Sequence, residues 1–208
     1  MSTATTKTQQ ATATNPLYPI FLKVHQLQVL IVGAGEVGLE KLSFMLKSSP
    51  DAQVTMIAPE VSEEIRELLT RRDYKVRLIE RVFEPEDVID KDLIIAATNN
   101  RATNEVIRKH GKAHGKLVNV ADTPDLCDFY LGAIVTRGNL KVAISTNGKS
   151  PTFAKRFRQL LEEVLPEDVN ELLNNLRSIR QKLVGDFAYK VKKLNEITAG
   201  MLDKEPEA

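Results

Sequence analysis

Three glycines, two and then three positions apart, follow directly after the apolar residues 29–32. In this GxGxxG pattern Gly33 permits a tight turn, Gly35 lets a pyrophosphate approach the backbone, and Gly38 lets a helix pack closely on the preceding strand. The helix expected from Glu36 onward directs unpaired N–H groups and a partial positive charge at that pyrophosphate. The pattern therefore predicts a dinucleotide-binding loop; the alternative is a tight strand-to-helix turn that binds nothing.

A second apolar run, residues 53–58, predicts the next strand of the same fold. The residues after that strand face the adenosine ribose of a bound dinucleotide, where an acidic side chain commonly binds the 2′-hydroxyl. Here Ala58 is followed by Pro59 and Glu60, so the acid comes late, and no arginine follows immediately to accept a 2′-phosphate. This arrangement favours NAD over NADP only mildly.

Residues 92–97 predict a further strand, whose end leads into Thr98, Asn99 and Asn100. Ligands of open α/β sheets bind outside the carboxyl ends of the strands, so these side chains are candidates for hydrogen bonds to the ribose or the nicotinamide amide. We place Thr98 among the cofactor-binding residues. The alternative role for Asn99 or Asn100 is to cap the following helix, which is compatible with binding.

The strand expected over residues 116–120 ends at a candidate catalytic group. A carboxylate just past the carboxyl end of a parallel strand lies on the same edge of the sheet as the nicotinamide, within reach of a substrate. Asp122 is therefore the candidate general base, and Asn119 is a candidate substrate contact. The alternative for Asp122 is a turn-forming role, because Asp-Thr-Pro is common in turns.

A hydroxyl-rich loop precedes the C-terminal part of the chain. Its hydroxyls, its glycine and the N-terminus of the following helix could together bind an anion or a carboxylate. Lys155 and Arg156 add positive charge, although such side chains on a helix are usually only solvated. The candidate substrate-binding residues of this loop are Ser145, Thr146, Asn147, Lys149 and Ser150.

Composition narrows the classes of function. The 208 residues include 29 basic and 28 acidic ones, a balance that indicates neither a nucleic-acid partner nor a membrane surface. No apolar run approaches the roughly 20 residues of a membrane span and no signal peptide is evident, so we expect a cytoplasmic protein. Cys127 is the only cysteine, which excludes a disulfide framework. His110 and His114 lie one helical turn apart without a nearby acidic ligand, so no metal site is predicted.

These residues require an α/β fold. Residues 16–120 are expected to form a Rossmann-like parallel sheet that binds NAD, preceded by a disordered tail over residues 1–15. Residues 121–149 contain two strand-like segments around a turn at 137–139, which predict an appended β-hairpin region. Residues 150–208 show three amphipathic stretches, which predict a C-terminal helical domain or a dimer contact.

Four segments together form a more specific pattern than the glycine spacing alone. In chain order they are LIVGAGEVGLEK, AATNN, NVADTPDLCDF and VAISTNGKSP. With them the chain resembles the precorrin-2 dehydrogenase family, also known as the dehydrogenase module of sirohaem synthases, over residues 19–165. The resemblance implies oxidation of precorrin-2 to sirohydrochlorin with NAD as hydride acceptor and, in some members, insertion of ferrous iron. It also implies an intertwined homodimer formed through the hairpin region and the helical tail.

Carried over by position, the resemblance gives Asp122 the role in dehydrogenation and, where present, in chelation. It places NAD contacts on Glu36 and Val37 of the glycine loop and on Pro59 and Glu60 after the second strand. It also implies that the hydroxyl-rich loop lines the tetrapyrrole cleft.

Three hypotheses about function follow. We favour an NAD-dependent precorrin-2 dehydrogenase. The second is a bifunctional dehydrogenase and ferrochelatase, on which the sequence is nearly silent because a chelatase can use one carboxylate and transient metal contacts. The third is a non-enzymatic NAD-sensing regulatory domain like those of potassium-transport subunits, which share a VGAGxVG turn. Such domains usually place an acid directly after the second strand and have no loop like that of Asp122, and both features count against this hypothesis.

Overall fold

The computed structural model describes residues 15–201. Contacts divide the chain into two compact units, one comprising residues up to 131 together with 145–150, the other residues 132–144 together with those from 151 onward. The tail predicted over residues 1–15 lies outside the described residues, apart from Asn15. The hairpin and the C-terminal helices fall into one unit by this criterion, and the domain boundaries predicted at residues 120 and 149 stay a prediction.

The first unit is built on a five-stranded parallel sheet with the strand order β3-β2-β1-β4-β5. Its central strands are apolar runs buried on both faces, as predicted for a sheet with helices on either side. The strand order reverses between β1 and β4, and in folds of this kind such a reversal opens a crevice at the carboxyl ends of the strands. The strands are β1 (Gln28–Val32), β2 (Gln53–Ala58), β3 (Val76–Glu80), β4 (Leu93–Ala96) and β5 (Leu117–Val120).

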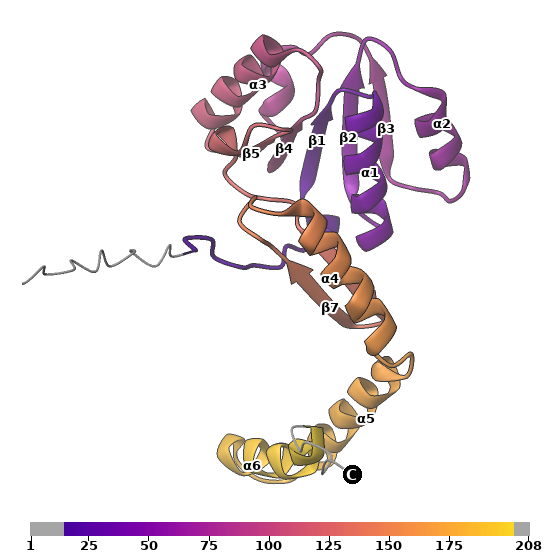
Figure 1. Cartoon of the computed structure of the whole chain (residues 1–208), viewed down its shortest axis with the longest axis vertical. Coiled ribbons are helices and arrows are strands. Elements are labelled where there is room, and N and C mark those ends of the chain that lie inside the picture. Colours follow the sequence, from indigo (N-terminus) through magenta and orange to yellow (C-terminus); the bar gives the residue numbers. More distant parts are fainter. Residues whose placement is uncertain (1–14, 202–208) are drawn as a thin grey trace, which may run out of the picture. The chain divides into compact units, whose positions relative to one another are not determined.

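Helices cover both faces of this sheet (Figure 1). They are α1 (Glu36–Ser48), α2 (Glu63–Thr70) and α3 (Arg101–Ala113). Successive residues of β1 point to opposite faces: Ile31 packs in one cluster with Leu42 of α1, and Leu30 packs in the other with Ile107 of α3. The sheet therefore separates two apolar cores, and the predicted Rossmann-like architecture is confirmed.

The turn from β1 into α1 brings backbone atoms closer together than a side chain would allow. Gly33 has a φ of +107°, and a Cβ atom there would overlap the carbonyl of Ala97 and lie 2.9 Å from the Thr98 nitrogen. A Cβ atom on Gly38 would overlap the carbonyl oxygen of Gly33. The tight turn and the close packing predicted for these two glycines are both present.

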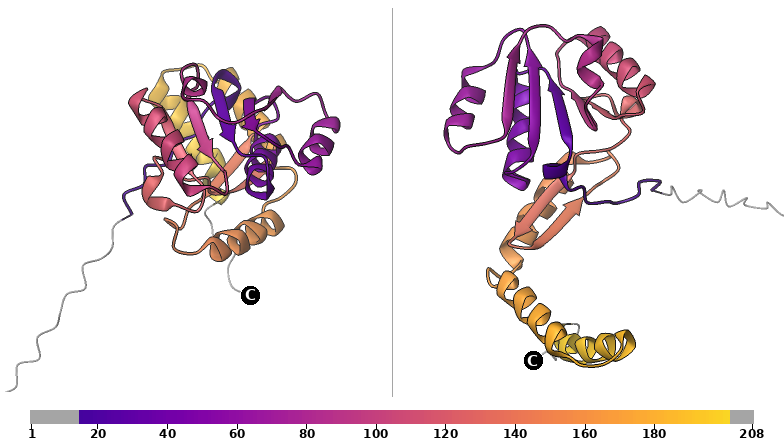
Figure 2. Two further views of the ribbon diagram at one scale, coloured as in Figure 1. Left: turned by 90° about the horizontal axis from the view of Figure 1, so that it is seen from above. Right: turned by 180° about the vertical axis from the view of Figure 1, so that it is seen from behind.

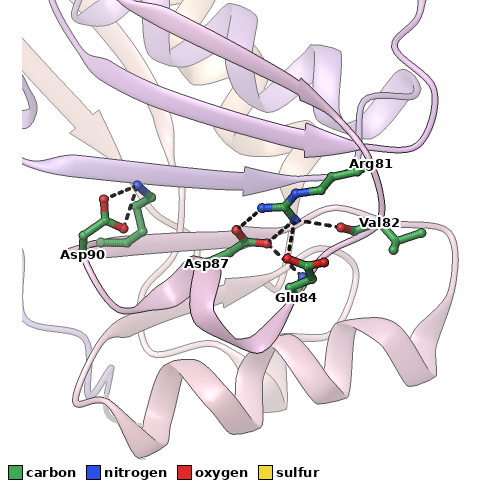
Figure 3. A network of polar contacts seen from close by, with 6 residues as sticks. Arg81, Val82, Glu84, Asp87 and Asp90 are labelled. Carbon is green, nitrogen blue, oxygen red and sulfur yellow. Dashed lines mark hydrogen bonds and ion pairs between the residues drawn. The ribbon is translucent and has the colours of Figure 1, made fainter.

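The chain crosses from β3 to β4 through a short connection that contains the 3₁₀ helix Pro85–Val88 (Figure 3). The Arg81 guanidinium donates to both carboxylate oxygens of Asp87, at 2.8 and 2.6 Å, and this hydrogen bonding raises the pKa of Arg81. Partial burial raises the pKa of Asp87, but the bonds from Arg81 and from the Glu84 N–H lower it by more. Val88 is fully buried against the sheet, so both its burial and the ion pair of Asp87 hold the 3₁₀ helix in place.

The second unit joins an antiparallel hairpin to three helices (Figure 2). Its elements are β6 (Ala133–Arg137), β7 (Leu140–Ile144), α4 (Pro151–Val164), α5 (Val169–Lys182) and α6 (Phe187–Thr198). The core of this unit is small: within the described residues its buried cluster consists of Val135, Ile144 and Ala154. The predicted hairpin and C-terminal helices are confirmed.

We expect Gly38→Ala to destabilise the fold by about 2 kcal/mol, because the new Cβ atom would have to displace backbone. Gly35→Ala is the matched control, since a Cβ atom at Gly35 meets nothing within 4 Å, and its unfolding free energy should change by less than about 1 kcal/mol. Urea unfolding followed by circular dichroism measures both variants. Equal losses would contradict the close-packing role of Gly38.

Candidate active site

The carboxyl ends of four strands bring the predicted residues to one edge of the sheet. Val32 pairs with both Ile57 and Ala96, and Ala96 pairs with Val120. Because these pairs are in register, the loops that follow them leave the sheet at the same level. Those loops carry Gly33, Pro59 with Glu60, Thr98, and Asp122.

The glycine loop is open on the side from which a ligand would approach. Gly35 and Glu36 are exposed, and a Cβ atom on Gly35 would meet nothing within 4 Å. Helix α1 begins at Glu36 with Gly35 as its N-cap, so no capping side chain covers the N–H groups of its first turn. These groups and the helix dipole attract a pyrophosphate. The loop therefore fits a dinucleotide, and the contacts of Gly35, Glu36 and Val37 with the cofactor stay predictions.

A buried asparagine that sequence reasoning missed holds the loop after β4. Asn104 of α3 is 6% exposed; its Oδ1 accepts from the Thr98 hydroxyl at 2.7 Å and from the Thr98 N–H at 3.3 Å. Its Nδ2 donates to the Thr98 carbonyl at 3.0 Å. Asn100 caps α3 by accepting from the Thr103 N–H, so the predicted capping role is confirmed for this residue. The contact of Thr98 with the cofactor stays a prediction.

The segment after β2 turns back toward the glycine loop. Pro59 and Glu60 are exposed, and the Ser62 N–H, just before α2, donates to the Ala34 carbonyl at 3.2 Å. The Ser62 hydroxyl oxygen is buried and has no hydrogen-bond partner among the described residues. The end of β2 thus borders the glycine loop, and the contacts of Pro59 and Glu60 with the cofactor stay predictions.

Asp122 lies in the turn after β5 in a conformation that few non-glycine residues adopt. Its φ is +56°, in the left-handed region. The residue is exposed, and within residues 15–201 its carboxylate makes no hydrogen bond or ion pair. Strained backbone of this kind clusters at functional sites. A free carboxylate at this edge of the sheet is chemically suited to accept a proton from a bound substrate.

Hydrogen bonds from two neighbouring elements hold the loop after β5. The Lys112 ammonium of α3 donates to both carboxylate oxygens of Asp128, at 2.8 and 2.9 Å, and Arg108 Nε donates to the Leu126 carbonyl at 3.0 Å. Asp128 Oδ2 also accepts from the Val118 N–H of β5 at 2.9 Å. The loop is therefore anchored both to α3 and to its own strand.

The side chains of Asn119 and Cys127 also form hydrogen bonds that hold the loop after β5. Asn119 is 7% exposed, and its Nδ2 donates to the Phe129 carbonyl at 2.8 Å and to Cys127 Sγ at 3.4 Å. Cys127 Sγ also accepts from the Val120 N–H at 3.3 Å. Burial raises the pKa of the Cys127 thiol, which keeps it protonated. The predicted contact of Asn119 with the substrate stays a prediction.

The hydroxyl-rich loop before α4 belongs to the same compact unit as the sheet. Its hydroxyls support its own turn: Ser145 Oγ accepts from the Asn147 N–H at 3.2 Å, and Thr146 Oγ1 accepts from the Ser150 N–H at 3.1 Å. Asn147 has a φ of +53°, and Lys149 is exposed. The role of these five residues in substrate binding stays a prediction.

Residues 15–201 contain neither a metal-binding cluster nor a membrane-spanning helix. No three His, Cys, Asp or Glu side chains in this range gather closely enough to hold a metal ion. His114 Nδ1 lies 2.9 Å from the His110 carbonyl oxygen, a contact within one helix end. No helix in the same range is long and apolar enough to cross a membrane.

Sequence reasoning missed two residues that hold the site, Asn104 and Asp128. Asn104 shares the buried face of α3 with Ile107 and Gly111, so a polar residue at apolar helical spacing was the available signal. Asp128 offered no local signal, because its hydrogen-bond partners lie 10 and 16 residues away in the chain.

The parallel sheet, its glycine turn and the uncapped start of α1 define a dinucleotide-binding protein of the Rossmann class. A family model described as putative NAD(P)-binding matches residues 20–133, more than half of the chain. A second model, described as sirohaem biosynthesis protein central, matches residues 137–163. The first of these models covers more than half of the chain, so the chain belongs to this putative NAD(P)-binding family.

Individual relatives agree with this assignment. The siroheme synthase of Methylococcus capsulatus is 41% identical over 165 residues, which cover 79% of this chain and 34% of the relative. That of Psychrobacter cryohalolentis is 38% identical over 175 residues, 84% of this chain and 31% of the relative. This chain thus spans about a third of the length of these curated relatives. A solved structure titled SirC, precorrin-2 dehydrogenase, is 29% identical with a TM-score of 0.68, covering 87% of this chain and 89% of that one.

We expect Asp128→Asn to weaken the loop after β5. Partial burial raises the pKa of Asp128, but the hydrogen bonds from Lys112 and from the Val118 N–H lower it by more, so its pKa lies below the ordinary 3.8. A carboxyl group whose pKa is lowered by folding stabilises the fold fully above 3.8 and loses that contribution as the pH falls through the folded value.

The variant should therefore be less stable than wild type at pH 7 by about 1 kcal/mol, a modest figure because Lys112 is 42% exposed. The difference should shrink as the solution is acidified below the folded pKa. Urea unfolding of both proteins at a series of pH values measures it. A difference that stays constant into strong acid would show that the ionised carboxylate is not responsible.

Proposed function

We propose that this chain catalyses the NAD-dependent dehydrogenation of precorrin-2 to sirohydrochlorin. The observation that carries the proposal is the carboxylate of Asp122, which has no hydrogen-bond or ion-pair partner within residues 15–201 and lies in a loop at the same edge of the sheet as the glycine loop. The match to an NAD(P)-binding family and the relatives named siroheme synthase support it. The similarity to SirC, titled precorrin-2 dehydrogenase, extends over most of both chains and supports it further.

Dehydrogenation removes two hydrogens from the macrocycle. One leaves as a hydride with its electron pair, the other leaves as a proton, and a double bond forms. Bound NAD⁺ supplies the hydride acceptor and becomes NADH. The first turn of α1 binds the pyrophosphate, the loops after β4 and β5 orient the reactants, and Asp122 accepts the proton.

The substrate carries many carboxylates, and the loop before α4 is the proposed place where they bind. It combines hydroxyls, the exposed Lys149 and the N-terminus of a helix, all of which attract carboxylates. The proposed substrate contacts are Asn119, Ser145, Thr146, Asn147, Lys149 and Ser150.

Ferrous iron is a proposed second substrate. Its insertion replaces two pyrrole protons of sirohydrochlorin with one Fe²⁺ ion, and a carboxylate with no partner in the described residues can receive such protons. The relatives named siroheme synthase support this activity. The NAD-sensing hypothesis is less favoured, because it assigns no role to the strained, exposed Asp122.

A homodimer formed through the second unit is also part of the proposal. Helix α4 packs Ala154 and Leu161 against the hairpin, while a second apolar stripe stays exposed. Burying one large apolar side chain contributes about 1.5–3 kcal/mol, so a second copy that covers this stripe gains considerable stability. The exposed stripe, at helical spacing, consists of Phe153, Phe157, Leu160 and Val164.

The first test mixes purified protein with precorrin-2 and either NAD or NADP and follows the absorbance of the reduced nicotinamide. We expect reduction with NAD, followed by sirohaem formation above the protein-free rate once ferrous iron is added. Measurable NAD binding without reduction of either cofactor would overturn the dehydrogenase proposal and favour the regulatory hypothesis.

Asp122→Asn tests the general base directly. Asparagine tolerates the left-handed conformation and has the same shape but cannot accept the proton, so kcat should fall by about 100-fold or more. The dissociation constant for NAD, measured by calorimetric titration, should stay within about twofold of wild type. Turnover retained in the variant would remove Asp122 from the mechanism.

Phe157→Glu tests the proposed dimer. A charge in the middle of the exposed stripe should shift the protein toward monomer, because a buried unpaired carboxylate costs several kcal/mol. Phe44→Glu is the matched control, since Phe44 is 61% exposed on α1 in the other unit. Sedimentation velocity compares the two variants with wild type. An unchanged dimer in Phe157→Glu, or equal dissociation in both variants, would contradict the proposed interface.

A further inference from the structure

Within residues 15–201, only three polar or charged residues are buried as whole residues, and two of them are asparagines at the candidate site. Asn104 is hydrogen-bonded to the loop after β4, and Asn119 is hydrogen-bonded to the loop after β5. Burying an amide costs free energy unless it is hydrogen-bonded, so each must be matched by its partners. Both amides find those partners in the loops of the site.

Asn104 is bonded to a single residue of the first loop. Its Oδ1 accepts from the hydroxyl and the N–H of Thr98, and its Nδ2 donates to the Thr98 carbonyl. Thr98 in turn lies where the Gly33 turn approaches the end of β4. Asn104 therefore fixes backbone that borders the predicted pyrophosphate loop.

Asn119 is bonded to the far end of the second loop. Its Nδ2 donates to the Phe129 carbonyl and to Cys127 Sγ, so both amide hydrogens are engaged inside the protein. The strand residue is thereby tied to the point where the loop returns, and Asp122 lies between the two. This bonding gives Asn119 a positioning role in addition to the substrate contact that is proposed for it.

We propose that the two buried asparagines are positioning residues with separate tasks. Asn104 holds the loop after β4 in the geometry that binds the cofactor, and Asn119 holds the loop after β5, which carries Asp122. The inference rests on the proposed function, since it takes NAD as the cofactor and Asp122 as the base. The inference requires that substitution of Asn104 mainly weakens NAD binding and that substitution of Asn119 mainly slows turnover.

The experiment compares Asn104→Ala and Asn119→Ala in the full chain, each serving as a control for the other. Asn104→Ala should raise the dissociation constant for NAD about tenfold and leave kcat at saturating NAD within about threefold. Asn119→Ala should lower kcat about 100-fold, as expected when a base is displaced, and leave the dissociation constant for NAD within about twofold. Calorimetric titration and steady-state kinetics with precorrin-2 measure the two quantities.

A third variant controls for the loss of a hydrogen-bonded side-chain amide in general. Gln53→Ala removes hydrogen bonds to the His25 carbonyl and to Gln28, at the opposite end of the strands. Its kcat and its dissociation constant for NAD should equal those of wild type, even where its unfolding free energy falls. Changes in this variant as large as those of Asn104→Ala or Asn119→Ala would reduce both asparagines to general stabilisers and overturn the proposal.

Two isosteric variants keep the test decisive where an alanine variant fails to fold. Asn104→Asp retains the acceptor for the Thr98 hydroxyl and N–H and loses only the donor, so its NAD affinity should lie between those of wild type and Asn104→Ala. Asn119→Asp loses both donated bonds when ionised and should be as slow as Asn119→Ala. The reverse order of effects would overturn the proposal.

Failure of the proposed function can be told apart from failure of this inference. Wild-type protein that binds NAD but does not oxidise precorrin-2 contradicts the function, and the Asn104 effect on NAD binding is still measurable in that case. Amide hydrogen exchange in residues 121–128, which should accelerate in Asn119→Ala and stay unchanged in Asn104→Ala, needs no turnover. Equal exchange in both variants, or parallel losses of kcat and NAD affinity in both, would overturn the separation of tasks.

Discussion

The backbone contact around Gly33 is the constraint on which the site depends. Without a side chain at Gly33 or Gly38, the end of β1, the first turn of α1 and the end of β4 can approach one another directly. This approach brings the helix N-terminus, which attracts anions, beside the loop that Asn104 holds. A single Cβ atom at either glycine would push these segments apart and displace the glycine loop relative to the loop that carries Asp122.

The site combines a strained, free carboxylate with firmly held surroundings. The left-handed conformation of Asp122 costs about 1–2 kcal/mol for a residue with a side chain. The bonds of Asp128 to Lys112 and of Asn119 to Phe129 offset that cost by fixing the loop at both ends. Asp122 itself makes no bond within residues 15–201, so its carboxylate is available for chemistry. Asp128 and Asn119 thus support the loop, while the carboxylate available for chemistry belongs to a different residue, Asp122.

The two units differ in how completely they bury their apolar residues. The first has an extended core on each face of its sheet, which explains how it holds precise loop geometry. The second has only a small buried cluster in its described part and leaves large side chains such as Phe157 and Phe187 exposed. Apolar surface of this extent favours association, so the stability of this unit and its assembly are expected to be linked.

The strands, the glycine turn, the hairpin and the helices could all be predicted from the sequence, because periodicity and turn chemistry are local properties of the chain. The position of Asp122 at this edge of the sheet could be predicted as well, since parallel strands place all their carboxyl ends at one edge. The roles of Asn104 and Asp128 in holding the loops, and the exposure of the α4 stripe around Phe157, became visible only in the folded chain. These features depend on contacts between residues far apart in the chain, which no local pattern encodes.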